Sequence, residues 1–226
     1  MIDLIKKGLG YAIFFGISIP LYLLFSAPPI ALSGIEKYSN TVPTKEAKEL
    51  GMTLFKNKKY LEAKAFFEPS AYQGDVVSQL ALATVYFYDL TTVNNYQQAY
   101  RWFNQNSDNA FAQYYLSLLY QFGHGVDQSS SLSLFWLLQS ATQSFPPSQH
   151  NLATFHFNTG DYQEAYLWAM YARANGFSKS RSLVKQASAL LSPAEKANAD
   201  QNYKNTKVKH HWDDDQLSKP LEKVLK

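Results

Sequence analysis

Apolar residues recur through the middle of the chain at spacings that predict helices. A pattern of leucine, a small residue, any two residues and an aromatic residue occurs at 82–86 and 116–120, and 152–156 repeats it with histidine in the aromatic position. A weaker copy begins at residue 50, so the leading leucines lie 32, 34 and 36 residues apart. These positions gather on one helix face, which predicts the first helix of a repeated unit. The repeated positions are Leu50, Leu82, Tyr86, Leu116, Tyr120, Leu152 and His156.

A second pattern follows each copy of the first and predicts a second helix in every unit. It consists of a small residue and an aromatic residue three positions later: Ala63 and Phe66, Ala99 and Trp102, Ser133 and Trp136, Ala165 and Trp168. The small residue lets a neighbouring helix approach closely, and the aromatic side chain fills the adjacent groove. Turns rich in glycine and asparagine separate the helices, with Gly123, Gly125 and Gly160 as structural positions inside the units.

Together these patterns predict an all-α fold, because continuous strand patterning is absent. We expect a right-handed α-solenoid of about four helix-turn-helix repeats over residues 45–177, since one hairpin cannot bury both of its faces. Ser192-Pro193-Ala194-Glu195 has the composition of a helix start. Residues 178–203 are therefore predicted to be C-terminal capping helices, followed by a polar tail at 204–226.

The N-terminal segment predicts export across a membrane. Lys6 and Lys7 precede an apolar run at 9–25, and Ala27-Pro28-Pro29 ends it. Seventeen helical residues span about 25 Å, close to the thickness of a bilayer core. Residues 1–33 are interpreted as a hydrophobic helix that is either a membrane anchor or a signal peptide, and 34–44 as a linker. The predicted location is the inner membrane with the repeat domain in the periplasm; the alternative is a soluble periplasmic protein cleaved near Ser33.

Composition narrows the possible chemistry. The 226-residue chain has no cysteine, which excludes disulfides, thiolate metal sites and cysteine nucleophiles. Its net charge of +3 is spread along the chain, so we expect no nucleic-acid partner. No glycine-rich phosphate loop, G-x-S-x-G turn or H-E-x-x-H motif is present. We therefore expect no cofactor and no enzymatic activity.

The remaining candidate chemistry is sparse. His150 and His156 lie six residues apart, on different sides of a helix, and the acidic pairs Glu46/Glu49 and Asp161/Glu164 suit helix starts. His124 lies in a turn, where it is either a turn residue or a partner contact. The cluster at 210–215 is interpreted as a solvated tail, with a weak divalent metal site as the alternative.

Several tyrosines fall outside the repeated positions and are candidates for a partner-binding surface, since tyrosine is enriched in interfaces. They are Tyr88, Tyr96, Tyr100, Tyr114, Tyr115 and Tyr166. The sequence does not select among them, so the partner-binding residues stay undefined.

Residues 112–141 resemble a Sel1-type repeat, a relative of the TPR repeat with a longer loop between its helices. Ala112, Leu116 and Tyr120 match its first helix, Gly123-His124-Gly125-Val126 its loop, and Trp136 and Ser140-Ala141 its second helix. The units at 45–74 and 148–176 are closer to plain TPR. The unit at 78–107 keeps both helix patterns but has residues 89–93 in place of the glycine loop.

The resemblance implies a protein that assembles complexes. We expect a scaffold or adaptor of the bacterial cell envelope that binds another protein on the concave face of the solenoid. The alternative is a periplasmic immunity or inhibitor protein that neutralises a secreted toxin. A cell-wall-acting enzyme is a further alternative, disfavoured because the Sel1-like proteins proposed for that role are cysteine-rich.

Overall fold

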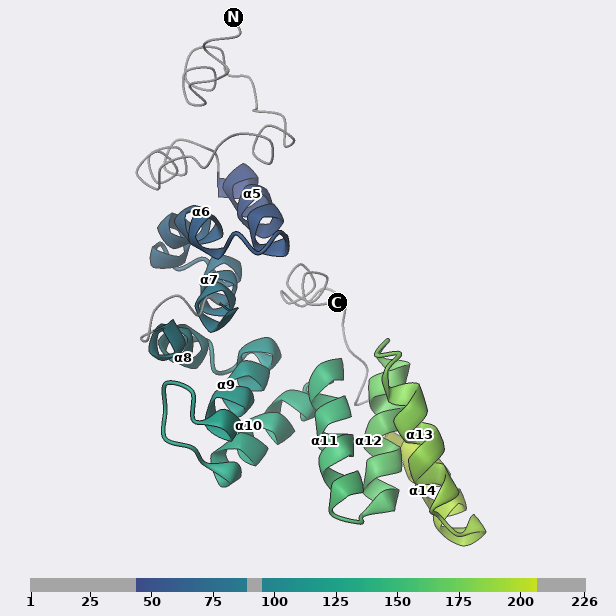
Figure 1. The fold of residues 1–226 in the computed structure, drawn as a ribbon. Helices are drawn as coiled ribbons and strands as arrows, with labels where there is room; N and C mark the ends of the chain where they lie inside the picture. The colour runs from purple at the N-terminus through teal and green to yellow at the C-terminus, as the bar shows by residue number, and fades with distance from the viewer. Residues whose placement is uncertain (1–43, 89–94, 207–226) are drawn as a thin grey trace, which may run out of the picture. The chain divides into compact units, whose positions relative to one another are not determined.

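The computed structural model describes residues 44–88 and 95–206, and these residues form ten α-helices (Figure 1). The helices are α5 (Thr44–Lys56), α6 (Tyr60–Tyr72), α7 (Val76–Tyr88), α8 (Asn95–Gln105), α9 (Ala110–Phe122), α10 (Ser130–Thr142), α11 (Pro146–Asn158), α12 (Tyr162–Ala174), α13 (Ser180–Ala189) and α14 (Pro193–Thr206). No strand occurs in the described part, so the predicted all-α repeat fold is confirmed. The predicted N-terminal helix over 9–25 and the tail from 207 onward lie outside the described residues.

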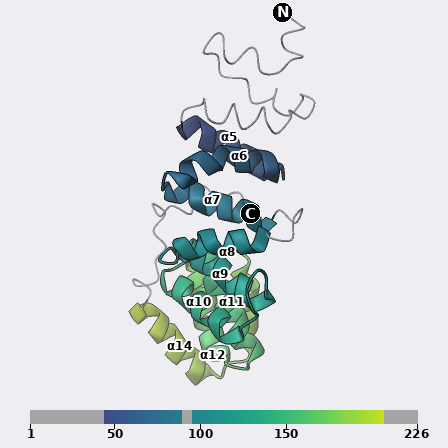
Figure 2. The same cartoon turned by 90° about the vertical axis from the view of Figure 1, so that its left-hand side faces the viewer.

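The chain divides into two compact units between Asn95 and Tyr96. In the first unit α5, α6 and α7 pack in chain order, one on the next (Figure 2). Gly51 is needed at the α5–α6 contact, because a Cβ there would lie 2.8 Å from a ring carbon of Phe67. The glycine therefore lets two helices approach closely around a large aromatic residue.

A polar link fixes the start of α7 in the first unit. The Lys48 ammonium of α5 donates a 2.6 Å hydrogen bond to an Asp75 carboxylate oxygen. The other Asp75 carboxylate oxygen accepts a 2.8 Å hydrogen bond from the Ser78 backbone N–H, as an N-cap residue does. The Asp75 carboxylate therefore caps the start of α7 and links it to α5.

The second unit continues the same arrangement, with each helix from α9 to α13 packed on the next (Figure 1). Phe103 of α8 stacks on Tyr115 of α9 with ring centroids 4.7 Å apart, and both side chains are fully buried. Leu152, Trp168 and Leu183 belong to a second cluster that extends through α11, α12 and α13. Burial of these large side chains provides most of the stabilisation of such a stack.

Buried hydroxyl and amide groups join successive hairpins. The Ser140 hydroxyl donates to the Ala110 carbonyl at 2.6 Å and lies 2.6 Å from the Ser148 hydroxyl. The Gln149 amide donates to the Ala141 carbonyl at 3.2 Å. These bonds connect the end of α10 to the starts of α9 and α11 and so fix the position of one hairpin on the next.

The first unit repeats part of this polar pattern. The Gln79 amide donates to the Ala71 carbonyl at 3.1 Å, as Gln149 does to Ala141. Ser78 corresponds to Ser148, but its buried hydroxyl has no hydrogen-bond partner among the described residues. The same sequence position is therefore satisfied in one repeat and unsatisfied in another.

The long loop between α9 and α10 packs against the start of α8. Gly123 ends α9 in the left-handed conformation (φ 68°). The His124 ring stacks on Tyr96 with centroids 4.2 Å apart. Gly125 has φ 72°, and a Cβ on it would lie 2.6 Å from the Tyr96 carbonyl carbon and 2.7 Å from the Gln97 nitrogen. Only glycine fits this close approach of two backbones.

The predicted capping helix is present as α14, which packs against α12 (Figure 2). Ser192 and Glu195 form a reciprocal capping box: the Ser192 N–H donates to the Glu195 carboxylate at 2.8 Å, and the Glu195 N–H donates to the Ser192 hydroxyl at 3.3 Å. The Tyr166 hydroxyl of α12 donates to Asp200 of α14 at 2.7 Å. The outer side of α14 is polar and exposed, as the last element of a repeat stack requires.

Candidate partner-binding groove

The repeat positions lie mostly inside the two units. Leu50, Ala63, Phe66, Leu82, Ala99, Leu116, Leu152, Ala165 and Trp168 are buried, whereas Tyr86, Trp102, Tyr120, Trp136 and His156 are half-buried. Phe103 is fully buried in place of its neighbour Trp102. Gly160 adopts φ 85° in the turn between α11 and α12. These residues therefore stabilise the fold, and other residues form most of the exposed surface.

The six tyrosines outside the repeat positions are engaged within their own units. The Tyr100 and Tyr120 hydroxyls lie 3.2 Å apart, and burial together with this contact raises the pKa of Tyr120 to about 12. Tyr115 is buried against Phe103, and Tyr166 bonds to α14. The remaining three make ring contacts: Tyr88 with Phe55, Tyr96 with His124, and Tyr114 with Phe145. They therefore do not define a free binding surface.

The histidines and acidic pairs also have local partners. His150 lies 2.9 Å from the Ser180 hydroxyl, and burial, followed by the nearby Lys179 charge, lowers the pKa of its ring. His156 lies 3.4 Å from Asp161, whose carboxylate also accepts from the Glu164 N–H at the start of α12. Among residues 44–88 and 95–206, no three His, Asp or Glu residues are grouped to hold a metal ion. The cluster at 210–215 lies outside the described residues.

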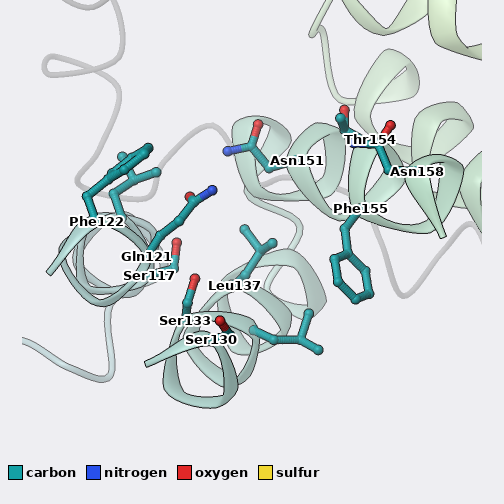
Figure 3. A pocket seen from close by; sticks show the side chains of 12 residues that line it. Ser117, Gln121, Phe122, Ser130, Ser133, Leu137, Asn151, Thr154, Phe155 and Asn158 are labelled. Carbon is teal, nitrogen blue, oxygen red and sulfur yellow. The ribbon is translucent and has the colours of Figure 1, made fainter. Parts of the chain in front are cut away.

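A groove of about 490 Å³ opens between α9, α10 and α11 in the second unit (Figure 3). Its lining residues are Ser117, Leu118, Gln121 and Phe122 of α9, Ser130, Ser133, Leu134 and Leu137 of α10, and Asn151, Thr154, Phe155 and Asn158 of α11. On α10 and α11 these follow i, i+3, i+4, i+7 spacing, so each helix turns one face to the groove. Its volume falls in the range of ligand-binding clefts.

The groove combines an apolar floor, exposed aromatic rings and unused amide groups. Phe122 and Phe155 are 57% and 40% exposed, which is unusual for phenylalanine. In Figure 3 the Gln121 and Asn151 side chains point toward one another from α9 and α11. No described residue forms a hydrogen bond with the side-chain amide of Gln121, Asn151 or Asn158. These amides are available to a ligand as both donors and acceptors.

No charged residue lines the groove. Residues 109–160, which contain all three of its helices, include one Asp (Asp127) and no Lys, Arg or Glu. An ionised ligand group in this groove would lose hydration without gaining an opposite charge. The groove therefore suits a neutral ligand with both polar and apolar parts.

None of the groove amides or exposed phenylalanines was singled out by sequence reasoning, which followed repeat positions and tyrosines. The lack of charge in residues 109–160 was the signal available in the sequence. Separately, in the described part of the chain no helix has the length and apolar character needed to span a bilayer. The predicted membrane segment at 9–25 lies outside that part.

Comparison with known proteins identifies the repeats. The Sel1 repeat family matches residues 76–105 and 110–145. The first match covers the unit whose loop departs from the glycine pattern, so both central units are Sel1 repeats. No curated protein matches the chain in a sequence search.

Two solved structures are similar to the chain. A protective antigen present in uropathogenic Escherichia coli strains, which displays an SLR fold, superposes with a TM-score of 0.64 at 21% identity. That alignment covers 92% of this chain and 46% of the antigen, so this chain spans about half of its length. A Sel1 repeat protein from Oxalobacter formigenes aligns with a TM-score of 0.32 at 17% identity, over 97% of this chain and 81% of that one. The chain therefore contains two Sel1 repeats, at residues 76–105 and 110–145, and has the same fold as an SLR protein.

Proposed function

We propose that this protein is a non-enzymatic scaffold that binds another protein through the groove between α9, α10 and α11. Proteins built from Sel1 repeats are generally protein-interaction scaffolds. The observation that carries the proposal is the set of unengaged amides beside two exposed phenylalanines in one uncharged groove. Exposed aromatic groups beside side chains that can form hydrogen bonds are typical of a surface that is buried in a complex.

Site-specific crosslinking tests this proposal with two matched glutamines. Gln121 is exposed and lines the groove, whereas Gln139 is exposed on α10 and does not line it. A photoreactive phenylalanine analogue at position 121 of the full chain, expressed in its native cells, is expected to form a specific protein adduct. The same analogue at position 139 is expected to form none. Absence of an adduct from position 121, or the same adducts from both positions, contradicts the proposal.

We further propose that the scaffold acts in the bacterial cell envelope. Support comes from the sequence: two lysines precede the apolar run at 9–25, a pattern that directs the following domain across the membrane. Protease treatment of intact spheroplasts provides the test. Digestion of the repeat domain without lysis is expected, and full protection until lysis contradicts an envelope location.

A further inference from the structure

We infer that the groove binds an uncharged segment of its partner in the polyproline II conformation. This inference rests on the proposed function, since it assumes that the groove is the partner-binding surface. It specifies the backbone conformation and the charge of the bound segment. Three observations carry it: the spacing of the amides on α11, the exposed rings beside the apolar floor, and the absence of charge.

The amide spacing selects the conformation. Asn151 and Asn158 are seven residues apart on α11, so their positions on the helix are separated by about 10.5 Å. A polyproline II chain repeats its orientation every three residues, or about 9.3 Å. An extended β-strand presents equivalent groups every two residues, or about 6.6 Å, and then at about 13 Å. Of these two conformations, polyproline II lies closer to the spacing on α11, within the reach of an asparagine side chain. A helical ligand also repeats at about 10.5 Å, but its carbonyl groups already accept hydrogen bonds within the helix.

The hydrogen-bonding groups of the groove also match those of a polyproline II segment. A polyproline II chain makes no internal hydrogen bonds, so its carbonyl groups require partners when they leave water. The amides of Asn151 and Asn158 have donors that no described residue accepts. Bonds from these two amides to carbonyls three residues apart satisfy both sides. Gln121 on the opposite wall supplies a third amide near Asn151 (Figure 3).

The apolar residues of the groove suit proline-rich side chains. Phe155 extends from α11, Phe122 lies on α9, and Leu134 and Leu137 contribute the apolar floor on α10. Proline-rich segments dock into grooves lined by aromatic residues and lose little conformational entropy because their backbone is already restricted. A groove without any charged lining residue disfavours a segment that carries Lys, Arg, Asp or Glu.

Fluorescence polarisation on the full chain tests the inference with labelled nine-residue peptides. The probe is three repeats of Ala-Pro-Pro. The first comparison peptide is three repeats of Gly-Ser-Ser, which is uncharged without the conformational preference, and the second is three repeats of Glu-Pro-Pro, which adds charge. We expect the Ala-Pro-Pro probe to bind at least about tenfold more tightly than either, because the first comparison peptide lacks the preformed backbone conformation and the second carries charges that the groove does not neutralise.

Variants of the full chain assign the binding to the amides. Asn151→Ala and Asn158→Ala are each expected to weaken probe binding about fivefold, the effect of one net hydrogen bond. Gln139→Ala, which changes an exposed amide outside the groove, is expected to leave it unchanged. Because neither asparagine side chain bonds within the fold, circular dichroism is expected to show unchanged helicity.

The outcomes separate this inference from the proposed function. Equal affinity for all three peptides, or unchanged affinity in the asparagine variants, overturns the inference. So does binding of a neutral oligosaccharide such as cellohexaose in place of the peptides. If the Gln121 crosslink to a partner persists in any of these cases, the groove is still a partner-binding surface and only the conformation of the ligand is wrong. If that crosslink is absent, the proposed function itself fails.

Discussion

Replacement of Gly125 by alanine tests how the loop between α9 and α10 is held. At φ 72° an alanine is strained by about 1–2 kcal/mol relative to glycine. Its Cβ would also lie 2.6 Å from the Tyr96 carbonyl carbon, a backbone atom of α8 that no side-chain rotation can move. Overpacking of this kind costs about 1–3 kcal/mol. We expect Gly125→Ala to lower the free energy of unfolding by about 2–5 kcal/mol in total.

Gly160 offers the matched control because it has φ 85° and nothing within 4 Å of its Cβ position. Gly160→Ala is therefore expected to carry only the conformational strain, about 1–2 kcal/mol. Urea denaturation of the full chain, followed by far-ultraviolet circular dichroism, measures both variants under the same conditions. If Gly125→Ala is no less stable than Gly160→Ala, the loop does not pack on α8 in this way.

Three further predictions concern buried polar groups and a helix end. Ser148→Ala removes a hydrogen-bonded buried hydroxyl and should lower the free energy of unfolding by about 1 kcal/mol in urea denaturation. Ser78→Ala removes a buried hydroxyl without a partner and should leave that free energy unchanged or raise it. The reverse order would contradict the difference between the repeats. Ser192→Ala should cost about 1 kcal/mol by removing the cap of α14, and an unchanged denaturation midpoint would contradict that role. Burial, followed by the nearby Lys179 charge, lowers the pKa of His150, so the unfolded chain binds the proton more readily and the free energy of unfolding should fall as the pH drops below about 6.5. In His150→Gln the thermal unfolding temperature should depend less on pH across this range. An equal pH dependence in the two proteins would contradict the assignment.

The repeat fold could be predicted from the sequence because each unit carries two independent helix patterns in constant phase. Turn residues such as Gly123 and the capping residues Ser192 and Glu195 are local signals whose effect does not depend on distant contacts. The structure places them at the end of α9 and the start of α14. Sequence reasoning is reliable at this level because local geometry alone determines the result.

The choice of buried aromatic residue in α8 could not be predicted in the same way. Phe103 and Trp102 lie four and three positions after Ala99, and both spacings fall on the same side of a helix. The structure buries Phe103 fully because it stacks on Tyr115 of α9. Which of the two residues is buried depends on the side chains of the neighbouring helix α9, and the pattern within α8 alone carries no information about them.

The groove depends on how three helices pack together, so the pattern of one repeat does not predict it. One related signal was nevertheless present in the sequence. Ser-Ala is followed eight residues later by Ser-Gln at both 70–79 and 140–149, and in each copy the glutamine amide donates to the carbonyl of the alanine. A search for repeats that includes small polar residues as well as apolar ones would have found these contacts between successive helices.

Placing a charge in the uncharged groove tests whether this groove is the partner-binding surface. Ser133 lines the groove on α10, and Gln139 lies on the same helix outside the lining. The measurement is the yield of the partner crosslink from position 121 in chains that also carry Ser133→Lys or Gln139→Lys. We expect a decrease of at least about tenfold for Ser133→Lys, because the ammonium has no counter-charge there, and no change for Gln139→Lys. An undiminished crosslink in Ser133→Lys would contradict this role of the groove.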